Sequence, residues 1–455
     1  MATVTKRGNT YKITVSCGYD TQGRQVRKSI TWKPADGMTK RQIEKELDRQ
    51  SVIFEERVRS GQVLSGSIKF ADFAEQWVNE YAQKQLRAKT VAQYQALLPR
   101  INAAIGHLRL DRIQPYHLIS FYNELSEDGV RKDTKYLCKI DFKAYLKEHN
   151  LTKCKLAESA GVNIGVLDSM TKGKNISEPS ADKICAVLHI KRTDLFNAID
   201  KGKLSGKTLH HYHTLISSIL STAVQWQIIN SNPCTRVKPP KMERKEALYL
   251  DEIQTGQLLN ALDKEPILYR TLFNTIIYSG MRRGEACGLE WSDVDFENGL
   301  IDINKSSLYL PSKGIYEDDT KNTSSRRVIK LPLTAIQLLK EYKTYQTEMR
   351  LKIGDRWQGS KKVFTTEDGR PLHPDTASGW FAKFIARHNL PHVTVHSLRH
   401  TNATLMIANG TDIKTVSKRL GHADISTTGN IYTHAIKSAD ELAASRLDDI
   451  FRKQA

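Results

Sequence analysis

The spacing of apolar residues constrains the fold of this chain most, because it has the period of a strand in only three stretches. Apolar and polar residues alternate over 11–17, and the apolar residues of 26–32 share one face of a second predicted strand. A further strand-like stretch runs from about 300 to 331. Helical spacing dominates the remainder. The sequence therefore predicts a mainly α fold with small β elements, an α+β protein of several domains.

Residues 1–62 are predicted to form a small sheet followed by a helix. Thr39 and Gln42 fit a capping box, and the apolar residues after them recur at helical spacing. Basic side chains are expected to point outward from the strands, and they are Lys12, Arg24, Arg27 and Lys28. A basic sheet of this kind either lies in a DNA groove, which we favour, or is a solvated surface.

Residues 66–240 are predicted to be helical. Phe73, Trp77 and Tyr81 step by four, which is typical of a core-facing stripe. Further helices are expected at 90–105, 117–125 and 209–229. Pro239 and Pro240, followed by a charged run, predict a linker to a domain over 245–455.

Residues 132–203 have a character of their own and interrupt the helical region. Their apolar and glycine spacing has the rhythm of a compact helix-turn-helix bundle, and it resembles the Cro/repressor family. The expected recognition helix, 163–170, offers Asn163, Asp168 and Ser169 but no basic residue before Lys172. Base edges are usually read by Arg, Lys, Asn or Gln. DNA contact, protein docking and a structural role therefore stay open for this block.

The charge balance indicates a polyanionic partner. The 455 residues carry 69 Lys and Arg against 50 Asp and Glu, a net charge of +19. A surplus of this size attracts nucleic acid, although it also fits a solubilising surface. The six cysteines are scattered without a Cys-x-x-Cys pair, and no apolar run is long enough for a membrane span. With no secretory signal, these features predict a reducing, soluble, intracellular protein.

Four short polar stretches in the C-terminal part supply groups that handle phosphate. They are Ser279–Glu285, Thr320–Arg327, His396–His400 and Leu420–Tyr432. In the first, Glu285 is placed to brace Arg282, and in the second a lysine at a hairpin tip would reach a phosphate. In the third, His396 and Arg399 share a helical face. Each stretch is weak evidence alone, because an exposed loop lysine or a core histidine is common.

A metal site is the competing reading of the histidines. His392, His396 and His400 are spaced by four, a spacing that would place them on one helical face. The stretch lacks the glutamate of the His-Glu-x-x-His signature, and Arg399 would add positive charge beside an ion. We therefore expect no metal, and His392 and His400 are read as core histidines.

Together the four stretches resemble the tyrosine recombinase (phage integrase) family, in order and in spacing, across 245–455. The resemblance implies that Tyr432 is the nucleophile, Arg282 and Arg399 clamp the phosphate, and Lys321 protonates the leaving oxygen. It further assigns proton transfer to His396, a phosphate hydrogen bond to His422 and a supporting role to Glu285. Segments 1–62 and 66–240 are similar to the arm-binding and core-binding domains of integrases from Gram-positive conjugative transposons and phages.

The resemblance also implies partners and architecture. A C-shaped clamp would close on double-stranded attachment-site DNA, and a homotetramer would integrate and excise a mobile element through 3′-phosphotyrosine links and a Holliday junction. No cofactor is implied, because the phosphotyrosine keeps the energy of the phosphodiester. A directionality factor or a host DNA-bending factor would assist, in the cytoplasm of a bacterium and near its nucleoid. The apolar residues of 438–455 predict a tail helix that docks on a neighbouring protomer or on its own domain.

Two other functions remain open from the sequence. A transcription regulator would use the helix-turn-helix block, but it leaves the ordered phosphate-handling residues unexplained. A type IB topoisomerase would use the same covalent chemistry without exchange between defined sites.

Overall fold

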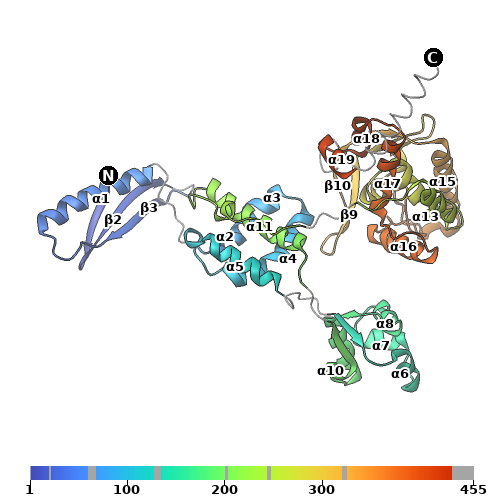
Figure 1. Ribbon diagram of the computed structural model, residues 1–455, viewed down its shortest axis with the longest axis horizontal. Helices are drawn as coiled ribbons and strands as arrows, with labels where there is room; N and C mark the ends of the chain where they lie inside the picture. Colours follow the sequence, from blue (N-terminus) through green and yellow to red (C-terminus); the bar gives the residue numbers. More distant parts are fainter. Residues whose placement is uncertain are drawn as a thin grey trace, which may run out of the picture. The chain divides into compact units, whose positions relative to one another are not determined.

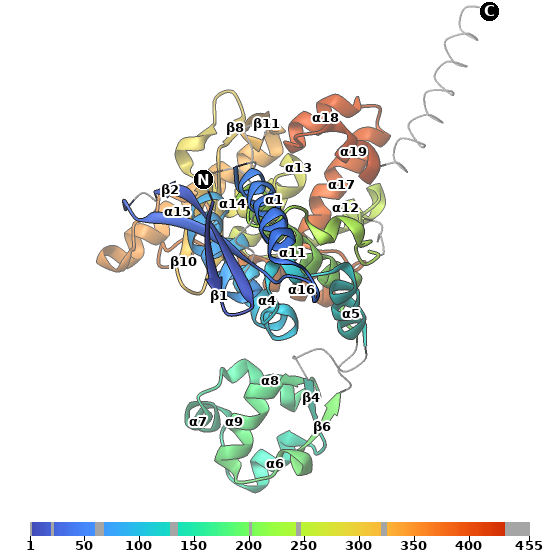
Figure 2. The ribbon, with the colours of Figure 1, turned by 90° about the vertical axis from the view of Figure 1, so that its left-hand side faces the viewer.

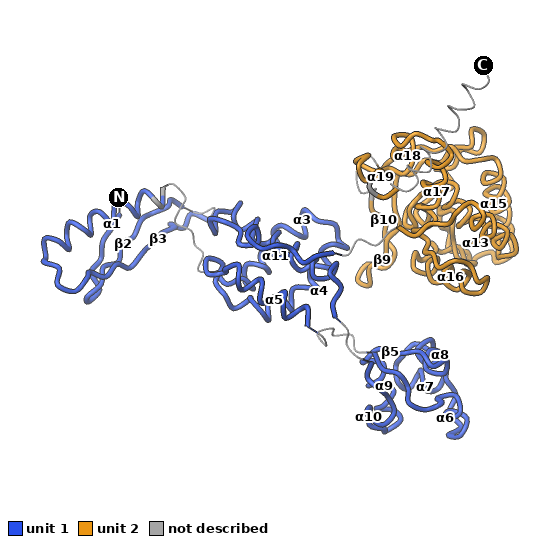
Figure 3. Tube along the Cα trace, in the orientation of Figure 1, with its two compact units in different colours: residues 1–244 blue, residues 245–455 orange. Residues whose placement is uncertain are grey.

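The computed structural model describes residues 2–19, 22–59, 68–127, 135–199, 203–242, 247–319 and 325–432. The chain divides into two compact units, residues 1–244 and 245–455 (Figure 3). In the described ranges helices predominate in both units, and the four sheets found there have two or three strands each (Figure 1). The predicted mainly α fold with small β elements is confirmed.

The N-terminal segment is a three-stranded antiparallel sheet with one helix packed on it. Its strands follow in the order β1 (Thr3–Arg7), β2 (Thr10–Tyr19) and β3 (Gln25–Trp32), and the helix is α1 (Lys40–Arg59). Ile13 and Val15 of β2 are buried with Phe54 of α1. The predicted capping box is present, since the backbone N–H of Thr39 donates to Gln42 Oε1 at 2.9 Å.

The register of this sheet corrects one expectation about its basic residues. Lys28 lies directly opposite Val15, so it shares the face that carries the core rather than pointing outward. Lys12 and Arg27 lie on the other face, because their strand neighbours Ile13 and Lys28 are on the helix side. Arg24 precedes β3 and is exposed.

A helical module follows with its own core. Its elements are α2 (Phe70–Trp77), η1 (Val78–Ala82), α3 (Gln83–Gln85), α4 (Ala88–Ile105), η2 (Leu110–Arg112), α5 (Pro115–Ser126), α11 (Gly206–Gln225) and η3 (Pro233–Arg236). Phe73 and Trp77 are fully buried, as their spacing predicted, and Trp77 Nε1 donates to Thr222 Oγ1 at 2.9 Å. Helix α11 ends before the expected residue 229, because Gln227 adopts a left-handed conformation with φ 54°.

A second small module lies between α5 and α11 in the sequence. It comprises β4 (Lys135–Cys138), α6 (Phe142–Glu148), α7 (Lys153–Ala160), α8 (Ile164–Thr171), β5 (Ile176–Ser177), α9 (Glu178–Leu188), α10 (Arg192–Leu195) and β6 (Phe196–Ile199), grouped together in Figure 2. Leu156, Leu167 and Ile184 belong to a separate buried core. Strands β4 and β6 pair antiparallel, so the two ends of the module meet.

The turn between α7 and α8 has helix-turn-helix geometry. Gly161 ends α7 in a left-handed conformation, and Asn163 caps α8 by accepting from the Gly165 N–H at 2.8 Å. Asp168 on α8 is ion-paired with Lys153 of α7 at 2.7 Å.

The C-terminal unit is built around α13, which contacts α12, α14, α15 and α17. Its elements are α12 (Glu252–Leu262), α13 (Ile267–Ser279), α14 (Arg283–Gly288), η4 (Trp291–Asp293), β7 (Val294–Asp295), β8 (Leu300–Ile303), β9 (Lys305–Leu310), β10 (Gly314–Asp319), β11 (Arg327–Lys330), α15 (Leu333–Ile353), η6 (Gly354–Arg356), α16 (Pro374–Arg387), α17 (Val395–Ala408), α18 (Ile413–Leu420) and α19 (Ile425–Ile431). The predicted strand-like stretch forms a β9–β10 hairpin and, with β7, the sheet β11-β8-β7.

Some expectations lie outside the described residues. They concern Lys321 in the segment 320–324 and the tail helix over 438–455. Among the helices that the structure describes, none is both long enough and apolar enough to cross a membrane.

Candidate active site

The first arginine of the site lies at a sharp change of direction between two helices. Helix α13 ends at Gly280, which has φ +67°, and Arg282 then caps α14. A Cβ at Gly280 would lie 2.7 Å from Asn402 Oδ1 and 2.9 Å from Leu420 Cδ2. Glycine therefore allows both the turn and the close approach of α17 and α18.

Glu285 holds two arginines at once. Its Oε1 accepts from Arg282 Nη1 at 2.7 Å, and its Oε2 accepts from Arg327 Nη2 at 2.9 Å. The expected contact between Glu285 and Arg282 is thus present. Burial by itself would raise the pKa of Glu285, but Arg327 and Arg282 outweigh it and hold that pKa below the ordinary value. Glu285 is therefore ionised at neutral pH and fixes both guanidinium groups.

Arg399 is almost completely enclosed. It lies on α17, which begins with a capping box of Thr394 and Ser397, and it is 1% exposed. Its Nη1 donates to the Gly280 carbonyl at 2.9 Å, whereas its Nη2 has no hydrogen-bond partner within the described part of the chain. Burial, followed by the charge of Arg282, lowers the pKa of Arg399 to about 9. A buried cation with a free donor is suited to an anionic ligand.

Two of the expected histidines lie close to these arginines. His396 is one turn before Arg399 on α17 and is partly exposed. His422 follows the left-handed Gly421 at the end of α18, and its Nδ1 lies 2.8 Å from Thr428 Oγ1. Desolvation, and then the charge of Arg399, lowers the pKa of His396 and lowers that of His422 to about 4. Both rings are therefore neutral at neutral pH.

Tyr432 directly follows α19 and is 3% exposed. Its Oη lies 2.9 Å from Nδ1 of His400. Burial raises the pKa of Tyr432 to about 12, although Arg399 acts in the opposite direction. The free phenol is therefore protonated, and its acidity depends on its neighbours.

The structure brings Arg282, Arg399, His396, His422 and Tyr432 into one region, where the charge of Arg399 acts on both histidines and on Tyr432. Lys321 lies outside the described residues. Of the lysines near Lys321 in the sequence, Lys313 lies at the turn of the β9–β10 hairpin, and Lys330 pairs with Leu300 at the end of β11.

Two residues of the site were missed by the sequence analysis. Arg327 is buried against Glu285, and its Nε also donates to the Arg419 carbonyl at 2.6 Å. His400, read from the sequence as a core histidine, contacts Tyr432 instead. Its position beside Arg399, and four residues after His396, was the available signal.

The arrangement suits reactions at a phosphate. Arg282 and Arg399 offer positive charge and directional donors for oxygen atoms, and Tyr432 offers a nucleophilic oxygen. Across the described residues, no group of three or more His, Cys, Asp or Glu side chains is placed to hold a metal ion.

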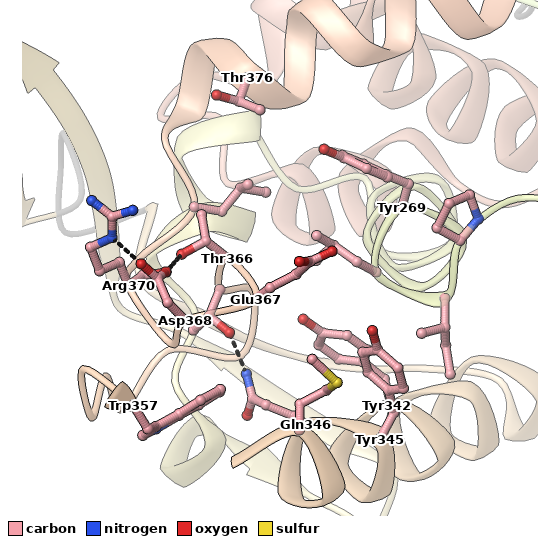
Figure 4. Close-up of a pocket in the computed structure, with 16 residues that line it drawn as sticks. Tyr269, Tyr342, Tyr345, Gln346, Trp357, Thr366, Glu367, Asp368, Arg370 and Thr376 are labelled. Atoms are coloured by element: carbon pink, nitrogen blue, oxygen red, sulfur yellow. Dashed lines mark hydrogen bonds and ion pairs between the residues drawn. The ribbon is translucent and has the colours of Figure 1, made fainter. Parts of the chain in front are cut away.

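A separate cavity of about 580 Å³ lies elsewhere in the C-terminal unit (Figure 4). Its walls include Tyr269, Tyr342, Tyr345 and Trp357, and Figure 4 shows Glu367 among them. None of the described candidate catalytic residues lines it. The cavity is therefore distinct from the candidate active site.

Comparison with protein families gives three matches along the chain. The phage integrase family matches residues 248–438, and the N-terminal SAM-like domain of phage integrases matches residues 69–126. The Cro/C1-type helix-turn-helix DNA-binding domain matches residues 142–201.

Individual relatives agree with these matches. A XerC-like tyrosine recombinase of Caldanaerobacter subterraneus subsp. tengcongensis is 30% identical over 293 residues, which is 60% of this chain and 74% of that protein. The ICEBs1 integrase of Bacillus subtilis is 28% identical over 264 residues, or 58% of this chain and 71% of the integrase.

A solved structure shows the same fold. Residues 82–397 of the Tn1549 transposon integrase, in complex with a circular intermediate DNA, superpose with a TM-score of 0.56 at 17% identity, covering 84% of this chain and 100% of that one. The 30% identity to the XerC-like recombinase over 74% of that protein, together with the family match over 248–438, establishes that the chain belongs to the phage integrase family of tyrosine recombinases.

Proposed function

We propose that this chain integrates and excises a mobile element by a transesterification in which Tyr432 attacks the scissile phosphate of an attachment site. The phenolic oxygen forms a bond to phosphorus, and the bond from phosphorus to the 5′ oxygen breaks. A 5′ hydroxyl from another strand then attacks the 3′-phosphotyrosine and restores the DNA backbone. The energy of the phosphodiester is kept in the intermediate, so the exchange needs no external energy source.

The other side chains of the site have separate roles in this reaction. Arg282 and Arg399 clamp the non-bridging oxygens and stabilise charge on the pentavalent phosphorus, an effect that supplies several kcal/mol in comparable sites. Lys321 protonates the leaving 5′ oxygen. His396 assists proton transfer, His422 donates a hydrogen bond to the phosphate, and Glu285 keeps Arg282 in place.

The observation that carries this proposal is the enclosed Arg399. Its Nη1 is fixed on the Gly280 carbonyl and its Nη2 has no hydrogen-bond partner within the described part of the chain, while its charge acts directly on Tyr432. An unsatisfied buried cation is costly for folding alone. A phosphate oxygen between Arg399 and Tyr432 would remove that cost and place phosphorus beside the nucleophile.

The remaining domains are assigned to DNA binding. Residues 1–62 would bind arm sites, and 66–240, interrupted by the inserted block 132–203, would bind the core site together with a catalytic domain over 245–455. The core-binding domain over 66–240 and the catalytic domain over 245–455 would close around the duplex as a C-shaped clamp. Four protomers would join two sites through a Holliday junction, with a directionality or DNA-bending factor, in the cytoplasm of a bacterium and near its nucleoid.

The proposal is tested with a supercoiled plasmid carrying two attachment sites from the element that encodes the chain. We expect deletion or inversion of the segment between the sites, and no product from a matched plasmid with one scrambled site. Relaxation on both plasmids without recombinants would identify a type IB topoisomerase. Binding without cleavage at several candidate sites would favour a transcription regulator.

A further inference from the structure

Within the described part of the chain, His400 provides a hydrogen-bond partner for the hydroxyl of the proposed nucleophile. Its Nδ1 lies 2.9 Å from Tyr432 Oη, and the two ring centres are 5.7 Å apart at an interplanar angle of 57°. His400 follows Arg399 on α17, whose first turn is fixed by the capping box of Thr394 and Ser397. The backbone of Tyr432 is fixed at the end of α19, because its N–H donates to the Thr428 carbonyl at 3.0 Å. Both partners are therefore positioned by regular structure.

His396 is less well placed for the same task. It meets His400 edge to face, with ring centres 4.8 Å apart, and it is partly exposed whereas Tyr432 is buried. The order of the three side chains thus runs from solvent through His396 and His400 to the buried phenol.

We infer that His400 is a catalytic residue: its Nδ1 accepts the hydrogen bond of the Tyr432 hydroxyl and takes that proton as the phenolic oxygen attacks phosphorus. The inference rests on the proposed function. In the resting state the ring proton of His400 is on Nε2, which leaves Nδ1 free as an acceptor. The bond from Oη to phosphorus forms, the bond from phosphorus to the 5′ oxygen breaks, and Lys321 supplies the proton for that oxygen. In the rejoining step His400 returns its proton to Oη.

The charges that face His400 make this transfer dependent on DNA. Burial, followed by His396 and Arg399, lowers the pKa of His400 to about 4, and burial raises that of Tyr432 to about 12. The charge of His400 also contributes to lowering the pKa of His422. Proton transfer is therefore unfavourable in the free protein. A bound phosphate adds negative charge beside Arg399, which offsets that arginine and favours the imidazolium.

The test compares rates of covalent adduct formation on a nicked suicide duplex over a range of pH. His400→Asn keeps an acceptor near Nδ1 without its basicity, and His400→Ala removes both. His392, which was expected from the sequence to be a core histidine, is exposed in the structure. His392→Asn therefore makes the same change at an exposed position of the same unit and serves as the matched control. A second duplex carries sulfur in place of the bridging 5′ oxygen, because a thiolate leaves without being protonated.

We expect both His400 variants to slow adduct formation by about 10²–10⁴-fold at neutral pH, the usual contribution of a general base. The defect should shrink toward high pH, where hydroxide replaces the base. With the sulfur-containing duplex, the rate defect of the His400 variants should be unchanged. The same duplex should relieve the rate defect of Lys321→Ala, because the leaving thiolate needs no proton. A wild-type rate in His400→Asn, a defect independent of pH, or rescue by sulfur would overturn the inference.

Two further results distinguish a failure of the His400 inference from misfolding of a variant and from a failure of the proposed function. Nitrogen NMR of the wild-type chain should show His400 protonated on Nε2, and a proton on Nδ1 would exclude it as the acceptor even if a variant misfolds. No adduct from the wild-type chain would overturn the proposed function and this inference with it. An adduct that is normal in the His400 variants would overturn the inference alone.

Discussion

At the scale of single residues, Glu285 controls the geometry of the arginine pair, because it is buried and accepts from both Arg282 and Arg327. We expect Glu285→Gln to lower the free energy of unfolding of the C-terminal unit by roughly 3 kcal/mol, since it leaves two guanidinium groups around a neutral amide. Scanning calorimetry measures the loss. Glu341→Gln, which alters an exposed ion pair with Arg270, should cost less than about 1 kcal/mol. Equal losses in the two variants would contradict this view of Glu285.

The same carboxylate predicts a pH dependence. The pKa of Glu285 in the folded chain is below its ordinary value of 4.5, so its ion pairs contribute fully above that value. This contribution is lost as the pH falls through the lowered pKa. The drop in melting temperature between neutral and acid pH should therefore be smaller in Glu285→Gln than in wild type. A drop of the same size would show that Glu285 is not responsible.

Gly280 gives a second prediction at this scale. Gly280→Ala would place a Cβ within 3 Å of Asn402 and Leu420, at a φ that side chains disfavour, and should cost about 1–2 kcal/mol or more. Gly379→Ala lies within α16 where nothing is within 4 Å, so it should stabilise the chain by roughly 0.5–1 kcal/mol. Thermal unfolding of the two variants should therefore shift in opposite directions. A harmless Gly280→Ala would contradict the close packing of α13 on α17.

At the scale of elements, the helices were predicted well, because they depend on local sequence patterns. Contacts between residues far apart in the sequence could not be predicted in this way. The stripe of Phe73 and Trp77, and the capping box at Thr39, depend on neighbours within a few residues, and both were predicted. The burial of Arg327 against Glu285, and the contact of His400 with Tyr432, join residues 42 and 32 positions apart. No local pattern encodes such contacts. Lys28 was misplaced because the strand register was unknown, and a change of one position reverses the face.

The N-terminal sheet allows a prediction at this scale, because its two faces differ. Lys12 and Arg27 lie on the face opposite the core, whereas Lys28 shares the face of Val15. If the outer face binds DNA, Lys12→Ala and Arg27→Ala should weaken arm-site binding and reduce its salt dependence by about 0.9 for each lost phosphate contact. Lys28→Ala is the matched control and should change the slope little. DNA affinities of the three variants, measured across salt concentrations, test this prediction. Equal effects of all three substitutions would exclude an interface confined to the outer face of the sheet.

At the scale of the whole molecule, the module from β4 to β6, which lies within the proposed inserted block 132–203, is built as a separable unit. Its core is separate, and β4 pairs with β6 so that its ends meet. The helices on either side of it contact each other directly, since Tyr122 Oη lies 3.0 Å from His213 Nδ1 and Phe121 packs against Tyr212. Replacing the block with a short Gly-Ser linker should therefore preserve folding and core-site cleavage. Calorimetry and adduct assays test this, and loss of the α5–α11 packing would show that the block is structurally required.

The central claim for the whole molecule is that Tyr432 becomes covalently attached to DNA. The most direct measurement is mass spectrometry of the tryptic peptide from an adduct trapped on a nicked attachment-site duplex. We predict a 3′-phosphate linked to Tyr432, and no adduct from Tyr432→Phe although that variant still binds the duplex. An adduct that persists in Tyr432→Phe, or one attached to another residue, would contradict the account.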